Sequence, residues 1–271
     1  MDVTPKKPST PWRSCHGLLE VGPSGKTSRE DNALSPYRFR PIRHIVAGVT
    51  DVAWPYAEAH RDAIAESWAK AIEANPALFD GEVLIIAESR VEGDRFEARY
   101  RPVRFSQFLH YMRHGAPDGR SRNGFALAGL TSADGALVMG VMGGHTANAG
   151  KIYFPGGTPD LSDIVEGQVD LEGSVRRELE EETGLAANEV SFDPGFWMAE
   201  DDKRCIFVKV VRSPLAADDL KRSILDRLSR QPEPELAGIH IVREASDLMP
   251  ERMPPFQLAH AEWWLAGGGR S

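Results

Sequence analysis

The chain is poor in cysteine, since only Cys15 and Cys205 occur among its 271 residues. Two cysteines so far apart cannot form a disulfide framework or a four-ligand zinc site. We therefore expect a protein of a reducing compartment. Cys205 lies in an apolar, strand-like run and is expected to be a small core residue.

Long apolar runs and an excess of basic residues are missing as well. No apolar run is long enough to span a bilayer, and residues 1–14 lack the apolar core of a secretory signal. We therefore expect a cytoplasmic protein that does not bind a membrane. The formal net charge of −8 argues against broad binding to nucleic acid, which needs a basic surface. Small phosphorylated substrates stay compatible, because a bound cation reverses the local field.

The most informative segment that is present is Arg177–Leu185, which contains four glutamates. Adjacent like charges repel, and nothing within the segment neutralises four carboxylates. Because an α-helix turns by about 100° per residue, Glu178, Glu181 and Glu182 project to one side and Glu180 to the other. Three carboxylates on one side of a helix favour a hard divalent cation, which prefers oxygen ligands and leaves room for phosphate oxygens.

This segment resembles the signature of the Nudix hydrolases, Arg-Glu-apolar-any-Glu-Glu-any-Gly-apolar, at every specified position. Gly184 supplies the left-handed residue that ends the helix. Upstream, residues 153–157 (Tyr-Phe-Pro-Gly-Gly) resemble the strand-to-loop transition of the family. A solvated, glutamate-rich helix is the alternative interpretation, but it does not require the arginine or the glycines. The resemblance implies an α+β fold, the Nudix α/β/α sandwich, and metal-dependent cleavage of phosphoanhydrides.

One part of the family pattern is absent. The family has a further glutamate where this chain has Val169, and the loop between Gly157 and Arg177 is longer than in the family. The insertion lies within residues 158–168 and is acidic, through Asp160, Asp163 and Glu166. Asp170 is placed to cap the helix N-terminus. It could instead take over part of the role of the missing carboxylate, and the sequence leaves both possibilities open.

The resemblance implies that Glu178, Glu181 and Glu182 hold Mg²⁺, with Mn²⁺ as a possible substitute. Such an ion screens the charge of the phosphate oxygens and acidifies a coordinated water. The resemblance also implies that Arg177 orients a glutamate through an ion pair, for which a guanidinium has the right geometry.

Substrate contacts are expected around the Gly-Gly pair and the loop before it. Gly156 and Gly157 would let the backbone approach metal and phosphates closely. His145, in a loop of small residues, and Lys151 are the basic residues expected to reach the substrate. Four aromatic residues could stack a base, but aromatics near strands are more often core; these are Tyr153, Phe154, Phe196 and Trp197.

A general base or extra metal ligand often comes from a separate loop in this family. Glu235 is the residue that we expect in this role, with Glu233 behind it, because both precede a strand at 239–242. The acidic run at 200–202 is the other possibility, and a solvated hairpin turn explains it better.

The chain is expected to have three parts. Residues 1–38 are rich in Pro, Ser, Lys and Gly and should form a flexible tail. Residues 39–120 should form a small α+β segment, with one helix opened by Pro55 and a hairpin through 92–94. Residues 121–271 should form the Nudix-like domain, with strands at 125–130, 137–142, 151–154 and 205–211, and helices at 218–228 and near the C-terminus.

The expected function is hydrolysis of a nucleoside diphosphate linked to another moiety, such as a UDP-sugar or ADP-ribose. The N-terminal segment, with its Asn75–Gly81 turn, resembles that of the subgroup that cleaves UDP-glucose and UDP-galactose. A nucleoside triphosphate pyrophosphatase is the alternative within enzymes. A catalytically idle, nucleotide-sensing module is the alternative outside them. Relatives with N-terminal segments are commonly dimers, so a homodimer is compatible.

Overall fold

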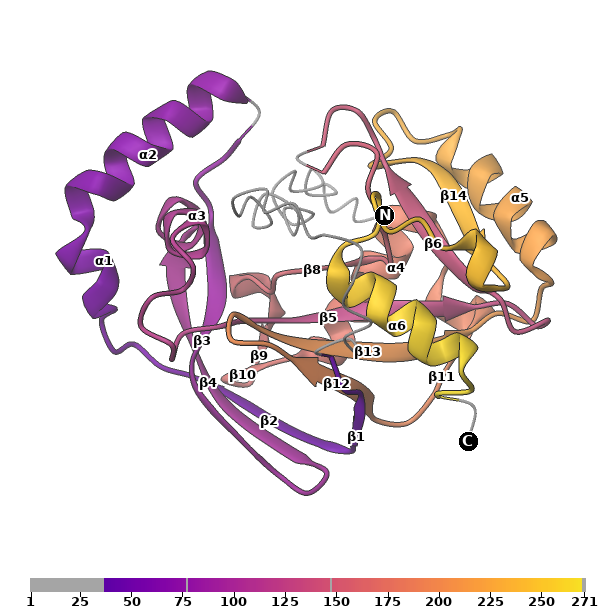
Figure 1. Ribbon diagram of the computed structural model, residues 1–271, viewed down its shortest axis with the longest axis horizontal. Helices are drawn as coiled ribbons and strands as arrows, with labels where there is room; N and C mark the ends of the chain where they lie inside the picture. Colours follow the sequence, from indigo (N-terminus) through magenta and orange to yellow (C-terminus); the bar gives the residue numbers. More distant parts are fainter. Residues whose placement is uncertain (1–36, 77, 147, 270–271) are drawn as a thin grey trace, which may run out of the picture.

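The computed structural model of the chain describes residues 37–76, 78–146 and 148–269. Nearly all of the expected tail, residues 1–38, therefore lies outside the described residues, and so does Cys15. The described chain is a mixed α+β structure with two β-sheets and six α-helices (Figure 1). Among these six, none has the length and apolar character needed to cross a bilayer.

The larger sheet contains nine strands, and β5 lies at its centre. Every residue of β5 is buried, which is expected for a strand that is covered on both faces. β5 pairs in parallel with β13 and in antiparallel fashion with β6. The order along the sheet is β1 (Arg40–Ile42), β12 (Phe196–Glu200), β13 (Arg204–Arg212), β5 (Asn123–Thr131), β6 (Leu137–Met142) and β14 (Leu236–Val242). Three short strands pair beside this path: β7 (Ile152–Tyr153), β8 (Gly156–Gly157) and β11 (Ser191–Phe192).

Helices cover both faces of this sheet. In Figure 1, α6 (Pro255–Leu265) lies in front of β5 and β13, and α4 (Leu171–Thr183) lies behind them. α5 (Ala217–Leu228) packs beside β14 and β6. On the α6 side, the ring of Phe256 meets that of Phe125 at 5.6 Å between centroids. The acidic helix α4 is thus one outer layer of a three-layer arrangement.

The smaller sheet has five strands, in the order β3, β4, β2, β10 and β9. Their bounds are β2 (His44–Val49), β3 (Glu82–Glu92), β4 (Arg95–Arg104), β9 (Ile164–Val165) and β10 (Gln168–Val169). Three helices complete this part: α1 (Pro55–Ala59), α2 (Arg61–Ala74) and α3 (Phe105–Arg113). A separate apolar cluster, which includes Trp54, Phe108 and Tyr111, forms its core.

Both sheets contain strands from either side of residue 120. β1 belongs to the N-terminal segment but pairs with β12 in the larger sheet. β10 belongs to the following segment but pairs with β2 in the smaller sheet. The two expected parts of the chain therefore share their sheets.

Most expected elements are present, and the differences have physical reasons. The single helix expected from Pro55 is two helices, because the chain leaves helical geometry at His60, where φ is −117°. β1, β2, β9 and β10 were not predicted from the sequence. Trp264 on α6 is 2% exposed and donates its indole N–H to the carbonyl oxygen of Gly135 at 3.1 Å.

Candidate functional site: an acidic helix and its loops

The sequence of α4 determines both of its ends. Asp170 caps the N-terminus, with its Oδ1 atom accepting the backbone N–H of Gly173 at 2.8 Å. Gly184 ends the helix in the left-handed conformation, with φ of 72°. The helix packs its apolar face against the sheet through Leu171, Val175 and Leu179. The capping interpretation of Asp170 is therefore confirmed.

The glutamates of α4 do not all share one environment. Glu178 and Glu182, one helical turn apart, are 3% and 4% exposed. Glu181 is exposed at the edge of the same side, and Glu180 is exposed as well. The structure therefore buries two of the three predicted ligands together.

A fourth carboxylate, that of Glu235, lies near the buried pair. The backbone N–H of Gly156 donates a hydrogen bond of 3.0 Å to Oε1 of Glu182. Burial, and then the charge of Glu235, raises the pKa of Glu182 well above its usual range, against the lowering effect of that hydrogen bond. Glu178 and Glu181 add smaller effects in the same direction. The loop before β14 thus brings the charge of Glu235 close enough to act on Glu182, and its role as a base or metal ligand stays a prediction.

This cluster fits a hard divalent cation in its chemistry and charge. Its donors are carboxylate oxygens, which Mg²⁺ prefers, and their mutual repulsion is what a cation would relieve. Among the described residues, however, no three His, Cys, Asp or Glu side chains are arranged so that they could hold a metal ion. The residues that would hold it are Glu178, Glu181 and Glu182.

The acidic insertion supplies the ion-pair partner of Arg177. Nη2 of Arg177 lies 2.6 Å from Oδ1 of Asp163, whose side chain is fully buried. The same Nη2 lies 3.4 Å from Oε1 of Glu178. The other oxygen of Asp163 accepts the backbone N–H of Asp160 at 2.8 Å, which orients the carboxylate. Arg177 therefore links the insertion to a predicted metal ligand.

The acidity of the insertion is evident in the sequence, but the pairing of Asp163 with Arg177 was not predicted. The available signal was the Asp160 and Asp163 pair, three residues apart, which form a capping turn around a short 3₁₀-helix. Val169, where the family has a glutamate, is 4% exposed and part of the main apolar core. In the described chain, the carboxylate that pairs with Arg177 is that of Asp163.

Gly156 and Gly157 form β8 and pair with the middle of β5. A Cβ atom on Gly156 would lie 2.4 Å from the carbonyl oxygen of Ala126, so only glycine fits there. His145 is exposed and lies beside Gly143, whose N–H donates to the carbonyl oxygen of Glu235 at 2.7 Å. His145 is therefore close to the loop that carries Glu235.

The other residues named from the sequence lie in different surroundings. Nζ of Lys151 donates to the carbonyl oxygen of Glu251 at 3.1 Å, and no contact of Lys151 with the acidic helix appears among the described residues. Glu233 is exposed. Three of the four aromatic residues are core, namely Tyr153, Phe154 and Phe196, while Trp197 packs on Trp263. Cys205 is buried, and burial raises the pKa of its thiol to about 12.

Comparison with known proteins adds little to these observations. No protein-family model matches the chain, and no curated protein matches it. A solved structure described as a Nudix hydrolase from M. Smegmatis, RenU, is similar over 51% of this chain and 80% of its own. The sequence identity is 15% and the TM-score is 0.33, so this similarity is too weak to support an inference about function.

Proposed function

We propose that the protein is a divalent-cation-dependent hydrolase of phosphoanhydrides. The observation that supports this function is the burial of Glu178 and Glu182 one helical turn apart, where the charge of Glu235 acts on Glu182 and the backbone N–H of Gly156 donates to it. Burying several carboxylates together is unfavourable, and a bound cation would offset that cost. The Nudix-like pattern of the segment 177–185 specifies the same chemistry.

Each residue has a role in the proposed reaction. A bound Mg²⁺ would screen the phosphate oxygens and lower the pKa of a water molecule. Glu235 would accept the proton of the attacking water, which adds to phosphorus as the bridging P–O bond breaks. Arg177, held by Asp163, would keep Glu178 oriented. The products would be a nucleoside monophosphate and a phosphorylated remainder.

The substrate class that we propose is a nucleoside diphosphate linked to another moiety, such as a UDP-sugar or ADP-ribose. The N-terminal segment with α1, α2 and α3 supports it, since single-domain triphosphatases usually lack such a segment. We propose Mg²⁺ as the cofactor and a cytoplasmic location.

A second candidate function is a nucleotide-sensing module without chemistry. One observation favours it, because no three carboxylates of the described chain are arranged to hold a metal ion. The retention of buried Glu178 and Glu182 favours the hydrolase, because a sensor has no use for two buried acids on one helical turn.

The test is turnover of UDP-glucose, ADP-ribose, NADH, coenzyme A and dNTPs with Mg²⁺, for the parent and for Glu182→Gln. Loss of a metal ligand should lower turnover by roughly a hundredfold or more, since even partners outside the ligand shell cost up to that much. Glu180→Gln is the matched control, because Glu180 is exposed on the same helix and should be neutral. Nucleotide binding without turnover of any substrate would overturn the hydrolase in favour of the sensor.

A further inference from the structure

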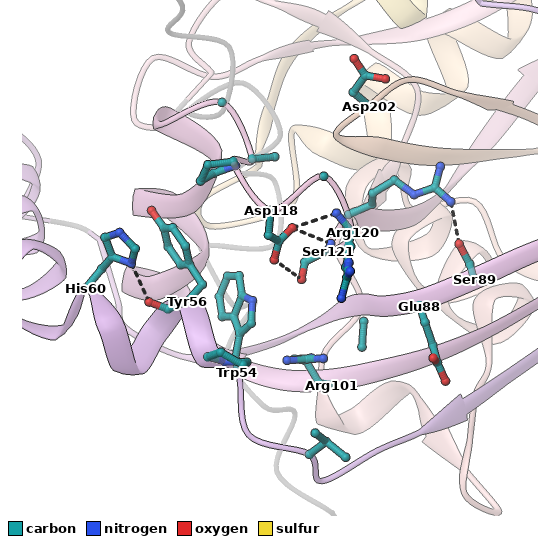
Figure 2. Close-up of a pocket in the computed structure, with 18 of the residues that line it drawn as sticks. Trp54, Tyr56, His60, Glu88, Ser89, Arg101, Asp118, Arg120, Ser121 and Asp202 are labelled. Atoms are coloured by element: carbon teal, nitrogen blue, oxygen red, sulfur yellow. Dashed lines mark hydrogen bonds between the residues drawn. The ribbon is translucent and has the colours of Figure 1, made fainter.

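A large cavity lies apart from the acidic helix. Its volume is about 1580 Å³, it is open to solvent, and it is lined by the start of α1, the β3–β4 hairpin, the turn at 115–122 and the β12–β13 hairpin (Figure 2). No residue of α4 and no residue of the Gly156 loop lines it. Its lining includes Trp54, Glu88, Arg101, Asp118 and Arg120.

Three acidic residues of the lining are already satisfied by donors of the protein. Asp118 accepts the hydroxyl of Tyr111, the backbone N–H groups of Arg120 and Ser121 at 2.9 Å, and the Ser121 hydroxyl at 3.0 Å. Asp201 accepts the backbone N–H of Lys203 and the side chain of Arg204. Glu200 pairs with Arg40 and, at 2.7 Å, with Arg122. Figure 2 shows the hydrogen bonds of Asp118 with Arg120 and Ser121, which hold its carboxylate against the turn at 115–122.

Among the arginines of the lining, Arg122 is paired with Glu200, whereas Arg101 is satisfied less well. Nη1 of Arg101 donates only to the carbonyl oxygen of Ala53, at 3.3 Å, and its buried Nε has no hydrogen-bond partner within the described chain. Neither Arg101 nor Arg120 forms an ion pair with any described carboxylate. Burial lowers the pKa of the Arg101 guanidinium, against the opposing effect of the nearby charges of Asp118 and Glu88. An ionised, partly dehydrated guanidinium calls for an acceptor with negative charge.

The remaining lining groups narrow the chemistry of that acceptor. Trp54 and Tyr56 are 6% and 8% exposed, so neither offers a ring face on which a nucleobase could stack. Glu88 and Asp202 are exposed at the cavity, so their carboxylates are available to accept hydroxyl groups. The complementary molecule therefore carries an oxyanion at one end and hydroxyl groups elsewhere, without a need for an aromatic ring.

We infer that this cavity binds a sugar phosphate, with the phosphate at Arg101 and Arg120 and the hydroxyl groups toward Glu88 and Asp202. Bidentate hydrogen bonds from a guanidinium suit phosphate oxygens. The cavity is a second ligand site, and its existence does not depend on the proposed hydrolase activity.

The test is calorimetric titration of the full chain with ribose 5-phosphate in the absence of divalent cations, which keeps a metal-dependent site from contributing. Arg101→Gln and Arg120→Gln should each weaken binding roughly tenfold or more, the effect of losing one charged hydrogen bond. Arg99→Gln is the matched control, because Arg99 is an exposed arginine of the same strand that does not line the cavity. Glu182→Gln should bind as the parent does, whatever its turnover.

Several results would overturn the inference. No saturable binding of ribose 5-phosphate would do so, as would equal affinity for ribose or for gluconate, which lack the phosphate. Equal weakening by Arg99→Gln would show a general charge effect. Should Arg101→Gln fail to fold, Arg120→Gln alone decides, because Arg120 is exposed and its replacement leaves the core intact.

Discussion

His260 should make the stability of the protein depend on pH. It lies on α6, is 2% exposed, and is surrounded by aromatic rings, including those of Phe39, Phe154 and Trp263. Neither ring nitrogen has a hydrogen-bond partner among the described residues. Burial lowers the pKa of this imidazole to about 3, so the native protein contains it in the neutral form.

The sign and size of the effect follow from linkage. The unfolded chain has a histidine pKa of about 6.5 and binds a proton below that pH, while the native state does not. Stability from neutral His260 is therefore fully present above pH 6.5 and is lost as the pH falls toward 3. Since one pKa unit is about 1.36 kcal/mol, lowering the pH from 7.5 to 5 should cost about 2 kcal/mol through His260 alone.

The assay is urea unfolding at pH 7.5 and pH 5 for the parent and for His260→Phe. The parent should lose about 2 kcal/mol more than the variant between the two pH values. His44→Phe is the control, because His44 is exposed and its replacement should leave the pH dependence of the parent unchanged. Equal losses in the parent and in His260→Phe would refute the reasoning, since His260 would then titrate alike in both states.

Two further predictions concern the loops around the acidic helix. Asp163→Asn breaks the ion pair with partly buried Arg177 and should lower the free energy of unfolding, measured by urea titration, by about 2 kcal/mol. Asp226→Asn is the control, because it breaks an exposed pair with Arg230 and should lower that free energy by less than about 0.5 kcal/mol. Equal effects of the two variants would contradict the buried role of Asp163. Gly156→Ala would push a Cβ atom against the Ala126 carbonyl oxygen and should lower the free energy of unfolding, measured by thermal unfolding, by about 2 kcal/mol or more. In the control Gly144→Ala the new Cβ atom meets no atom within 4 Å, so this variant should be nearly as stable as the parent. A neutral Gly156→Ala would show that β8 can move away from β5.

The acidic helix was predictable because its signals are local. The cap at Asp170, the stop at Gly184 and the helical spacing of its apolar residues lie within one short segment. β5 and β6 were predictable for the same reason, since apolar runs flank the turn at Asp134 and Gly135. The choice of Glu235 rested only on the family pattern, because nothing near it in the chain indicates an acidic helix.

Short strands with distant partners were not predictable. β1 has three residues and pairs with β12, and β10 has two residues and pairs with β2. Segments so short contain too little alternation to indicate a strand. Their partners are defined by the course of the chain in space, which also explains why both sheets cross the expected boundary at residue 120.

The sequence by itself determined the helix 171–183 with its glutamates, and the α+β character of the fold, because capping residues, glycines and apolar periodicity act over a few positions. Only the tertiary structure decided which carboxylates meet. It buried Glu178 and Glu182, left Glu181 at the edge, brought Glu235 to them and gave Arg177 the carboxylate of Asp163. Burial and charge neighbours depend on contacts between segments far apart in the chain, and no local pattern specifies those contacts.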